Sequence, residues 1–157
     1  MHRFTDTAGR EWMLRVNVGT ARRAKEDAGI DILGLLDAPK DGAKSQLETL
    51  SEDPSRIVPI VASLCKEQIA DRKIDAFTFE EGFDGETLEK ATNALLEEII
   101  DFFPNPRRAI LKKAKAMADK EQQEAAKAAL EMMENQAIVG AEEDAPQKKR
   151  PGDSQES

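Results

Sequence analysis

Two prolines, Pro104 and Pro106, constrain the fold more than any other feature because they divide one long helical pattern into two helices. Before them, apolar residues recur every three or four positions, the spacing that lines one face of a helix: Leu88, Ala91, Leu95, Ile99, Phe102 and Phe103. Asp84 is a residue type that caps helix starts. Pro104 ends this helix, and Asn105 followed by Pro106 is typical of a new helix start. The sequence therefore predicts two helices joined by a sharp corner.

The second of these helices is predicted to be long. From Arg107, directly after Pro106, to Glu134 the chain contains good helix formers and neither proline nor glycine. Its apolar residues become sparse with distance from the corner, ending in a thin, alanine-rich stripe: Ala125, Ala126, Ala129, Leu130, Met132 and Met133. We expect residues 121–139 to continue the helix and to be able to protrude and receive a partner helix. Residues 140–157 are polar and contain Pro and Gly, so a disordered tail is predicted there.

The N-terminal residues predict a β-hairpin. Segments 2–6 and 11–18 flank Gly9, which can adopt the positive φ that tight loops need. In the second segment Trp12, Leu14, Val16 and Val18 alternate with polar residues, as in a half-buried strand. An isolated hairpin is marginally stable in water, so its apolar face must pack on helices. Trp12 is then either a core anchor or an exposed binding residue.

Further helices are predicted between the hairpin and the corner. Thr20 is placed to cap the first of them. Another runs from Asp53 to about Arg72 along an apolar stripe, and it either kinks at Pro59 or begins close enough to hold this proline in its first turn. A short helix capped by Thr78 follows.

These patterns together predict a predominantly helical α+β fold. A small N-terminal β-hairpin packs on a helical domain, and a long C-terminal helix and a disordered tail follow. With 157 residues the chain has about the length of one domain. The expected organisation is a compact domain over residues 1–120, the helical continuation over 121–139 and the tail over 140–157.

Composition predicts a soluble, cytoplasmic protein. The net charge of -8 disfavours nucleic-acid binding, which depends on Lys and Arg displacing counterions. Cys65 is the only cysteine, which suits a reducing compartment. The sequence contains neither a signal-peptide pattern nor an apolar run long enough for a bilayer, so no membrane association is expected.

Charge reverses sign at the corner. Residues 75–104 carry nine acidic residues against Lys90 alone, whereas residues 105–120 carry six basic residues against Asp119 alone. One interpretation is that these are solvated faces of two helices that attract each other. The other is that the basic stripe binds an acidic partner.

Residues that support catalysis are scarce. His2 is the only histidine and occupies the second position, which we expect to be flexible, so we expect neither a catalytic nor a metal role for it. Cys65 lies on an apolar stripe and is a core residue or, alternatively, a reactive thiol. The pairs Glu80–Glu81 and Glu97–Glu98 are expected to face solvent. Since glycine-rich nucleotide-binding motifs are also missing from the sequence, we expect a protein that is not an enzyme and that needs no cofactor.

Three segments of the sequence resemble a known protein family. They are REWMLRVNVGTARRAKEDAGIDILGLLD, DPSRIVPIVASLCKEQ and FDGETLEKATNALLEEIIDFFPNPRRAILKKA, in this order over roughly residues 3–120. In this the chain resembles the tail assembly chaperones of tailed phages and prophages. The resemblance implies a non-catalytic protein in the host cytoplasm that keeps the tape measure protein soluble while tail-tube subunits polymerise around it. Tail-tube subunits are a further candidate partner, and the oligomeric state stays open.

Under this hypothesis the corner is the expected contact region. Helix-in-groove recognition uses apolar anchors with charged neighbours. The candidate partner-binding residues are Phe102, Phe103, Arg107, Arg108, Lys112 and Lys113. The alternative places both phenylalanines in the protein's own core.

Two other functions fit the same sequence. The protein could be a structural virion component, such as a tail terminator or a head-tail connector, which would stay in the finished particle. It could also be a small regulatory adaptor, or a nucleic-acid binder, that uses the basic stripe at 105–120.

Overall fold

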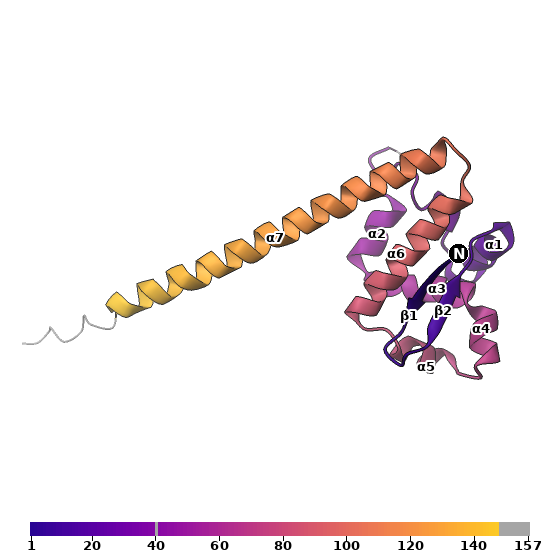
Figure 1. The fold of residues 1–157 in the computed structure, drawn as a ribbon, viewed down its shortest axis with the longest axis horizontal. Helices are drawn as coiled ribbons and strands as arrows, with labels where there is room; N and C mark the ends of the chain where they lie inside the picture. The colour runs from indigo at the N-terminus through magenta and orange to yellow at the C-terminus, as the bar shows by residue number, and fades with distance from the viewer. Residues whose placement is uncertain (40, 148–157) are drawn as a thin grey trace, which may run out of the picture. The chain divides into compact units, whose positions relative to one another are not determined.

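The computed structural model describes residues 1–39 and 41–147 (Figure 1). The chain divides into two units, Met1–Lys112 and Lys113–Ser157, each described by itself. The first unit contains a two-stranded hairpin and the helices up to the corner, and the second contains most of a long C-terminal helix. This confirms the predicted α+β class with its N-terminal hairpin.

Strands β1 (His2–Thr5) and β2 (Glu11–Leu14) form an antiparallel hairpin, with Phe4 opposite Trp12. The buried face holds Phe4, Trp12, Leu14 and Val16. Val18 was predicted on the same face but is 61% exposed, because the chain has already turned into the first helix there.

Helix α1 (Val18–Ala28) begins earlier than predicted. Its cap is Asn17, not Thr20. The Asn17 side chain accepts a hydrogen bond from the Thr20 backbone N–H, and the Thr20 hydroxyl accepts one from the Asn17 N–H, both at 2.9 Å. This reciprocal capping satisfies two backbone donors, whereas a cap at Thr20 would satisfy one.

The region predicted as one helix from Asp53 to Arg72 consists of three pieces: η2 (Pro54–Arg56), α3 (Ile57–Leu64) and α4 (Lys66–Asp71). Pro59 is the third residue of α3, within its first turn, where no N–H is needed. Two short helical elements precede these three pieces in the chain: η1 (Ile32–Gly34) and α2 (Gln46–Glu52).

The break between α3 and α4 allows α4 to cover the edge of β2. The Gln68 amide donates to the Met13 carbonyl at 2.8 Å and accepts from the Met13 N–H at 2.9 Å. The Arg72 guanidinium donates to the Glu11 carbonyl at 2.7 Å. These side chains occupy backbone groups that an exposed edge strand would otherwise offer to another chain.

Two further helices complete the first unit. Helix α5 (Ala76–Glu81) is capped by Asp75, which corrects the predicted cap at Thr78. The Asp75 carboxylate accepts from the Thr78 N–H at 2.7 Å and leaves Thr78 inside the helix. Helix α6 (Gly85–Phe102) begins after Asp84 as predicted.

The core lies between the hairpin, α3 and α6. Strand β1 packs along α6, and α1 packs on α3 (Figure 1). Trp12 is fully buried and meets Phe79 edge-on at 5.0 Å between ring centroids. Cys65 is also fully buried. Both residues are therefore core residues in this fold.

Helix α7 (Arg107–Gln147) follows the corner. A disordered tail was predicted from Gly140, but residues 140–147 are the last part of α7; extending an existing helix is easier than starting one. Residues 148–157 of the predicted tail lie outside the described residues. Across the described ranges, no helix combines the length and apolar composition needed to cross a membrane.

Candidate functional site

The predicted partner-binding residues lie around the α6–α7 corner, in different environments. Phe103 is buried at 9% exposure, and Phe102 is half-buried with its ring edge-on to Phe103 at 5.2 Å. The Arg107 guanidinium lies over the Phe103 ring, 4.0 Å from its centroid. Phe103 is thus part of the core, while Phe102 retains some accessible surface.

The two arginines hold the corner together. Arg108 donates to the carbonyl of Phe103 at 2.9 Å and to the carbonyl of Asp101 at 3.1 Å. These carbonyls belong to the end of α6, where a helix leaves acceptors without intrahelical partners. Arg107 pairs with Asp37 at 2.6 Å. Both arginines therefore have an intramolecular structural role.

The lysines are the more accessible cations. The Lys112 side chain is 61% exposed, and its ammonium lies 3.8 Å from Asp101 Oδ1. Lys113 is exposed and begins the second unit. The structure brings Phe102, Phe103, Arg107, Arg108 and Lys112 together within the first unit.

Helix α7 carries apolar side chains that are not buried. Leu130 and Met133 are 62% and 66% exposed. They lie three residues apart, so they share a face with Ala126 and Ala129. Met132 and, nearer the corner, Met117 and Ile110 are exposed as well. The stripe predicted from the sequence is thus an accessible surface of the helix.

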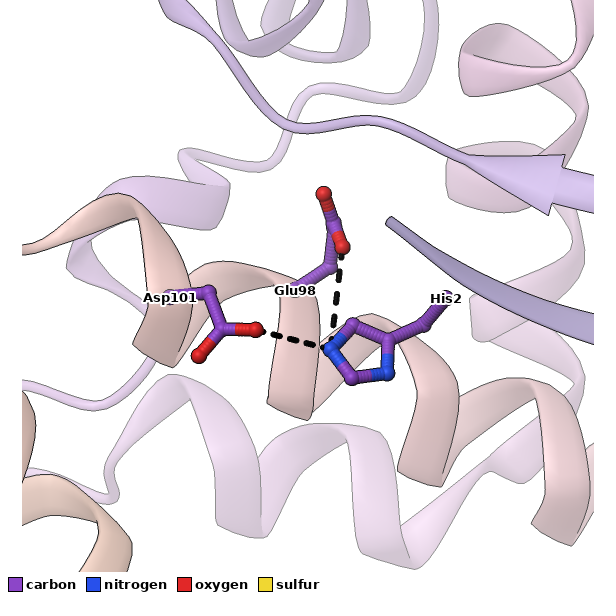
Figure 2. A group of neighbouring side chains, drawn as sticks. All are labelled: His2, Glu98 and Asp101. Carbon is purple, nitrogen blue, oxygen red and sulfur yellow. Dashed lines mark hydrogen bonds and ion pairs between the residues drawn. The ribbon is translucent and has the colours of Figure 1, made fainter.

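A second group of polar side chains joins β1 to α6 (Figure 2). His2 Nε2 lies 2.9 Å from Asp101 Oδ2 and 3.8 Å from Glu98 Oε2. The other ring nitrogen, Nδ1, lies 3.1 Å from Glu97 Oε2. We call His2, Glu98 and Asp101 the His2 cluster.

Two expectations about these residues are wrong. His2 was assigned to a flexible end, but it is the first residue of β1 and is half-buried. Glu98 was expected to face solvent, like Glu97, but is 8% exposed. The sequence contains one local signal, the spacing of Glu98 and Asp101 on one helical face. The histidine that meets them comes from the other end of the fold and has no local signal.

Electrostatics within the cluster favour the charged carboxylate of Asp101. The hydrogen bond with His2 lowers the pKa of Asp101 below its ordinary value, and the charges of His2, Lys112 and Arg108 act in the same direction. Burial opposes them and is outweighed. Asp101 is therefore a carboxylate anion at neutral pH.

Comparison with models of protein families, with curated proteins and with solved structures found no match to this chain.

Proposed function

We propose that this protein is a non-catalytic chaperone that binds an apolar helical segment of another protein, and that this partner is a phage tape measure protein. The observation that carries the proposal is the exposed apolar stripe of α7, centred on Leu130 and Met133. The identity of the partner comes from the resemblance to phage tail assembly chaperones.

A helical partner suits this stripe. Ala126, Ala129, Leu130 and Met133 follow the spacing of one helical face. The alanines allow close approach of a second backbone, and unbranched methionine adapts to uneven apolar surfaces. Burying a side chain such as Leu130 contributes about 1.5–3 kcal/mol. Such a surface favours binding along a helix over binding of a small molecule.

The first turns of α7 contribute accessible positive charge. Lys112 and Lys113 are exposed, so they can attract acidic residues of a partner. Arg107 and Arg108 are less available because they hold Asp37 and the end of α6. This weakens the alternative of an adaptor that binds an acidic partner through the whole basic stripe.

Co-expression with a helical fragment of a phage tape measure protein, taken from the same genome as this chain, tests the proposal. We expect the fragment to become soluble with the wild-type chain. The double substitution Leu130→Glu with Met133→Glu should abolish this effect, because it places two charges on the apolar stripe.

The matched control is Ala128→Glu with Asn135→Glu, which adds two carboxylates on the opposite side of the helix. This control should solubilise the fragment as the wild type does. A fragment that stays insoluble with the wild-type chain contradicts the proposal. Abundant protein in purified particles, measured by mass spectrometry, would instead support a structural virion component.

A further inference from the structure

The His2 cluster contains three potential metal ligands from two elements of the first unit. We propose that His2, Glu98 and Asp101 bind a divalent first-row transition-metal ion, with Zn²⁺ as the probe. This site is separate from the proposed chaperone function, and it departs from the expectation that His2 has no metal role.

The distances fit a single ion. His2 Nε2 lies 2.9 Å from Asp101 Oδ2 and 3.8 Å from Glu98 Oε2 (Figure 2). Each of the three residues offers one ligand atom within 4.8 Å of those of the other two. An ion with bonds of about 2.0–2.2 Å holds its ligands roughly 3–4 Å apart. Only small side-chain movements are needed to close the three ligands on an ion.

The surroundings of His2 prepare its Nε2 for coordination. Glu97 Oε2 lies 3.1 Å from Nδ1, so a carboxylate stands beside the ring nitrogen that does not face the cluster. Metal-binding histidines commonly donate their second ring N–H to a carboxylate, which orients the ring and increases its basicity. Glu98 and Asp101 are three residues apart on α6, so both carboxylates face His2 from one rigid helix.

Glu98 supplies the independent evidence for a ligand. Within the described part of the chain its Oε2 is buried and has no hydrogen-bond partner. The nearest positive groups are the N-terminal ammonium at 3.4 Å and His2 Nε2 at 3.8 Å. A buried carboxylate oxygen without a hydrogen bond is costly. A cation bound at this point would satisfy it directly.

The ligand types select the class of metal. Imidazole suits Zn²⁺, Fe²⁺ and Ni²⁺, and carboxylates suit harder ions such as Mn²⁺, so a mixed set favours ions between these limits. Three protein ligands leave positions for water. Lys112 lies 3.8 Å from the other oxygen of Asp101, Oδ1, and leaves Oδ2 available.

Calorimetric titration of the full chain, without a histidine tag, with Zn²⁺ at pH 7.5 tests the site. We expect one ion per chain. His2→Gln, Glu98→Gln and Asp101→Asn should each weaken binding at least tenfold. The matched control Glu89→Gln removes an exposed carboxylate from the same helix and should bind as the wild type does. Zn²⁺ should also raise the Tm of the wild type but not that of Glu98→Gln.

The carboxylate variants give the decisive result. An N-terminal amine and His2 can chelate metals without the fold, and Glu98→Gln and Asp101→Asn leave both groups in place. Wild-type affinity in these two variants would overturn the proposal, as would a wild-type chain that binds no Zn²⁺. If Glu98→Gln does not fold, as judged by circular dichroism, Asp101→Asn decides alone, since its side chain is 40% exposed.

Discussion

Asp6 illustrates how much one residue can determine in this fold. Its side chain is fully buried where the hairpin turns. It accepts hydrogen bonds from the backbone N–H groups of Ala8 and Arg10, from Arg10 Nε at 2.8 Å and from Trp12 Nε1 at 2.9 Å. Gly82 approaches so closely that a Cβ there would lie 2.8 Å from Asp6 Oδ2. This carboxylate joins the hairpin turn, the core tryptophan and the end of α5.

Replacing Asp6 should therefore destabilise the protein strongly. We expect Asp6→Ala to lower the free energy of unfolding by about 3–5 kcal/mol, because it leaves the buried Trp12 donor and the half-buried Arg10 donors without their acceptor. Urea unfolding followed by circular dichroism measures this change. Asp71→Ala, an exposed change on α4, is the control and should stay within about 0.5 kcal/mol of the wild type.

The same residue should contribute to acid sensitivity. Burial alone would raise the pKa of Asp6, but hydrogen bonds from Trp12 and Arg10 and the Arg10 charge lower it below the ordinary 3.8. A group with a lowered folded-state pKa stabilises the fold above its unfolded pKa, and this stabilisation disappears as the pH falls through the folded value. Unfolding measured from pH 6 to pH 2 should show a steeper loss in the wild type than in Asp6→Ala. Equal slopes would contradict this account.

Cys65 should be chemically inert in the folded protein. Burial raises the pKa of its thiol to about 12, although the charges of Arg23 and Arg72 oppose the shift. The thiolate is the reactive form, so a disulfide reagent at pH 8 should modify the native protein many times more slowly than the urea-unfolded protein. Rapid modification of the native protein would show that α3 opens readily.

At the scale of elements, the corner depends on contacts between helices as much as on its prolines. Arg108 supplies two hydrogen bonds to the carbonyls at the end of α6, and Arg107 covers Phe103. Neutralising all four basic candidate residues of the corner together would therefore change both the stability of the fold and any binding of a partner. These residues are Arg107, Arg108, Lys112 and Lys113. Lys112 and Lys113 are the residues to change when partner attraction alone is of interest.

The substitution Arg108→Ala should show how much the corner's intramolecular hydrogen bonds contribute to stability, apart from any effect on a partner. We expect it to lower the free energy of unfolding by about 1–3 kcal/mol, because charged hydrogen bonds to the carbonyls of Phe103 and Asp101 are lost. Lys113→Ala removes an exposed charge and should have an effect within about 0.5 kcal/mol. Thermal unfolding of the two variants side by side makes the comparison. Equal stabilities would mean that water replaces Arg108 at this position without loss.

At the scale of the whole molecule, stability and the proposed function belong to different units. Every core residue with a described side chain lies within Met1–Lys112. The exposed stripe at Leu130 and Met133 lies in the second unit. Changes in the second unit can therefore affect binding without affecting the fold of the first.

Ending the chain after Lys120 tests this division. The shortened protein should keep a cooperative unfolding transition within a few degrees of the full chain, because its core is complete. It should no longer solubilise the tape measure fragment. A shortened chain that fails to fold would show that the second unit is needed for stability, and one that still solubilises the fragment would place binding in the first unit.

Local rules account for the features that the sequence predicted well. The alternation at Trp12 and Leu14, the cap at Asp84 and the stop at Pro104 each depend on residues within a few positions of one another. The same rules were less reliable where neighbouring residues compete for one role, as when Asn17 rather than Thr20 caps α1. For the candidate binding residues, the sequence identified the corner. It did not show that Arg107 and Arg108 make intramolecular contacts while Lys112 and Lys113 stay exposed.

The sequence by itself determined several of the elements: a hairpin, a helix that begins after Asp84, a proline corner and a long helix with a thin apolar stripe. Only the tertiary structure decided which polar groups meet. His2 and Glu98 come from strand and helix at distant points of the chain, as do Met13 and Gln68. Their contacts exist only once the hairpin packs on α6 and α4 turns toward β2, because a polar pair distant in sequence leaves no periodic pattern.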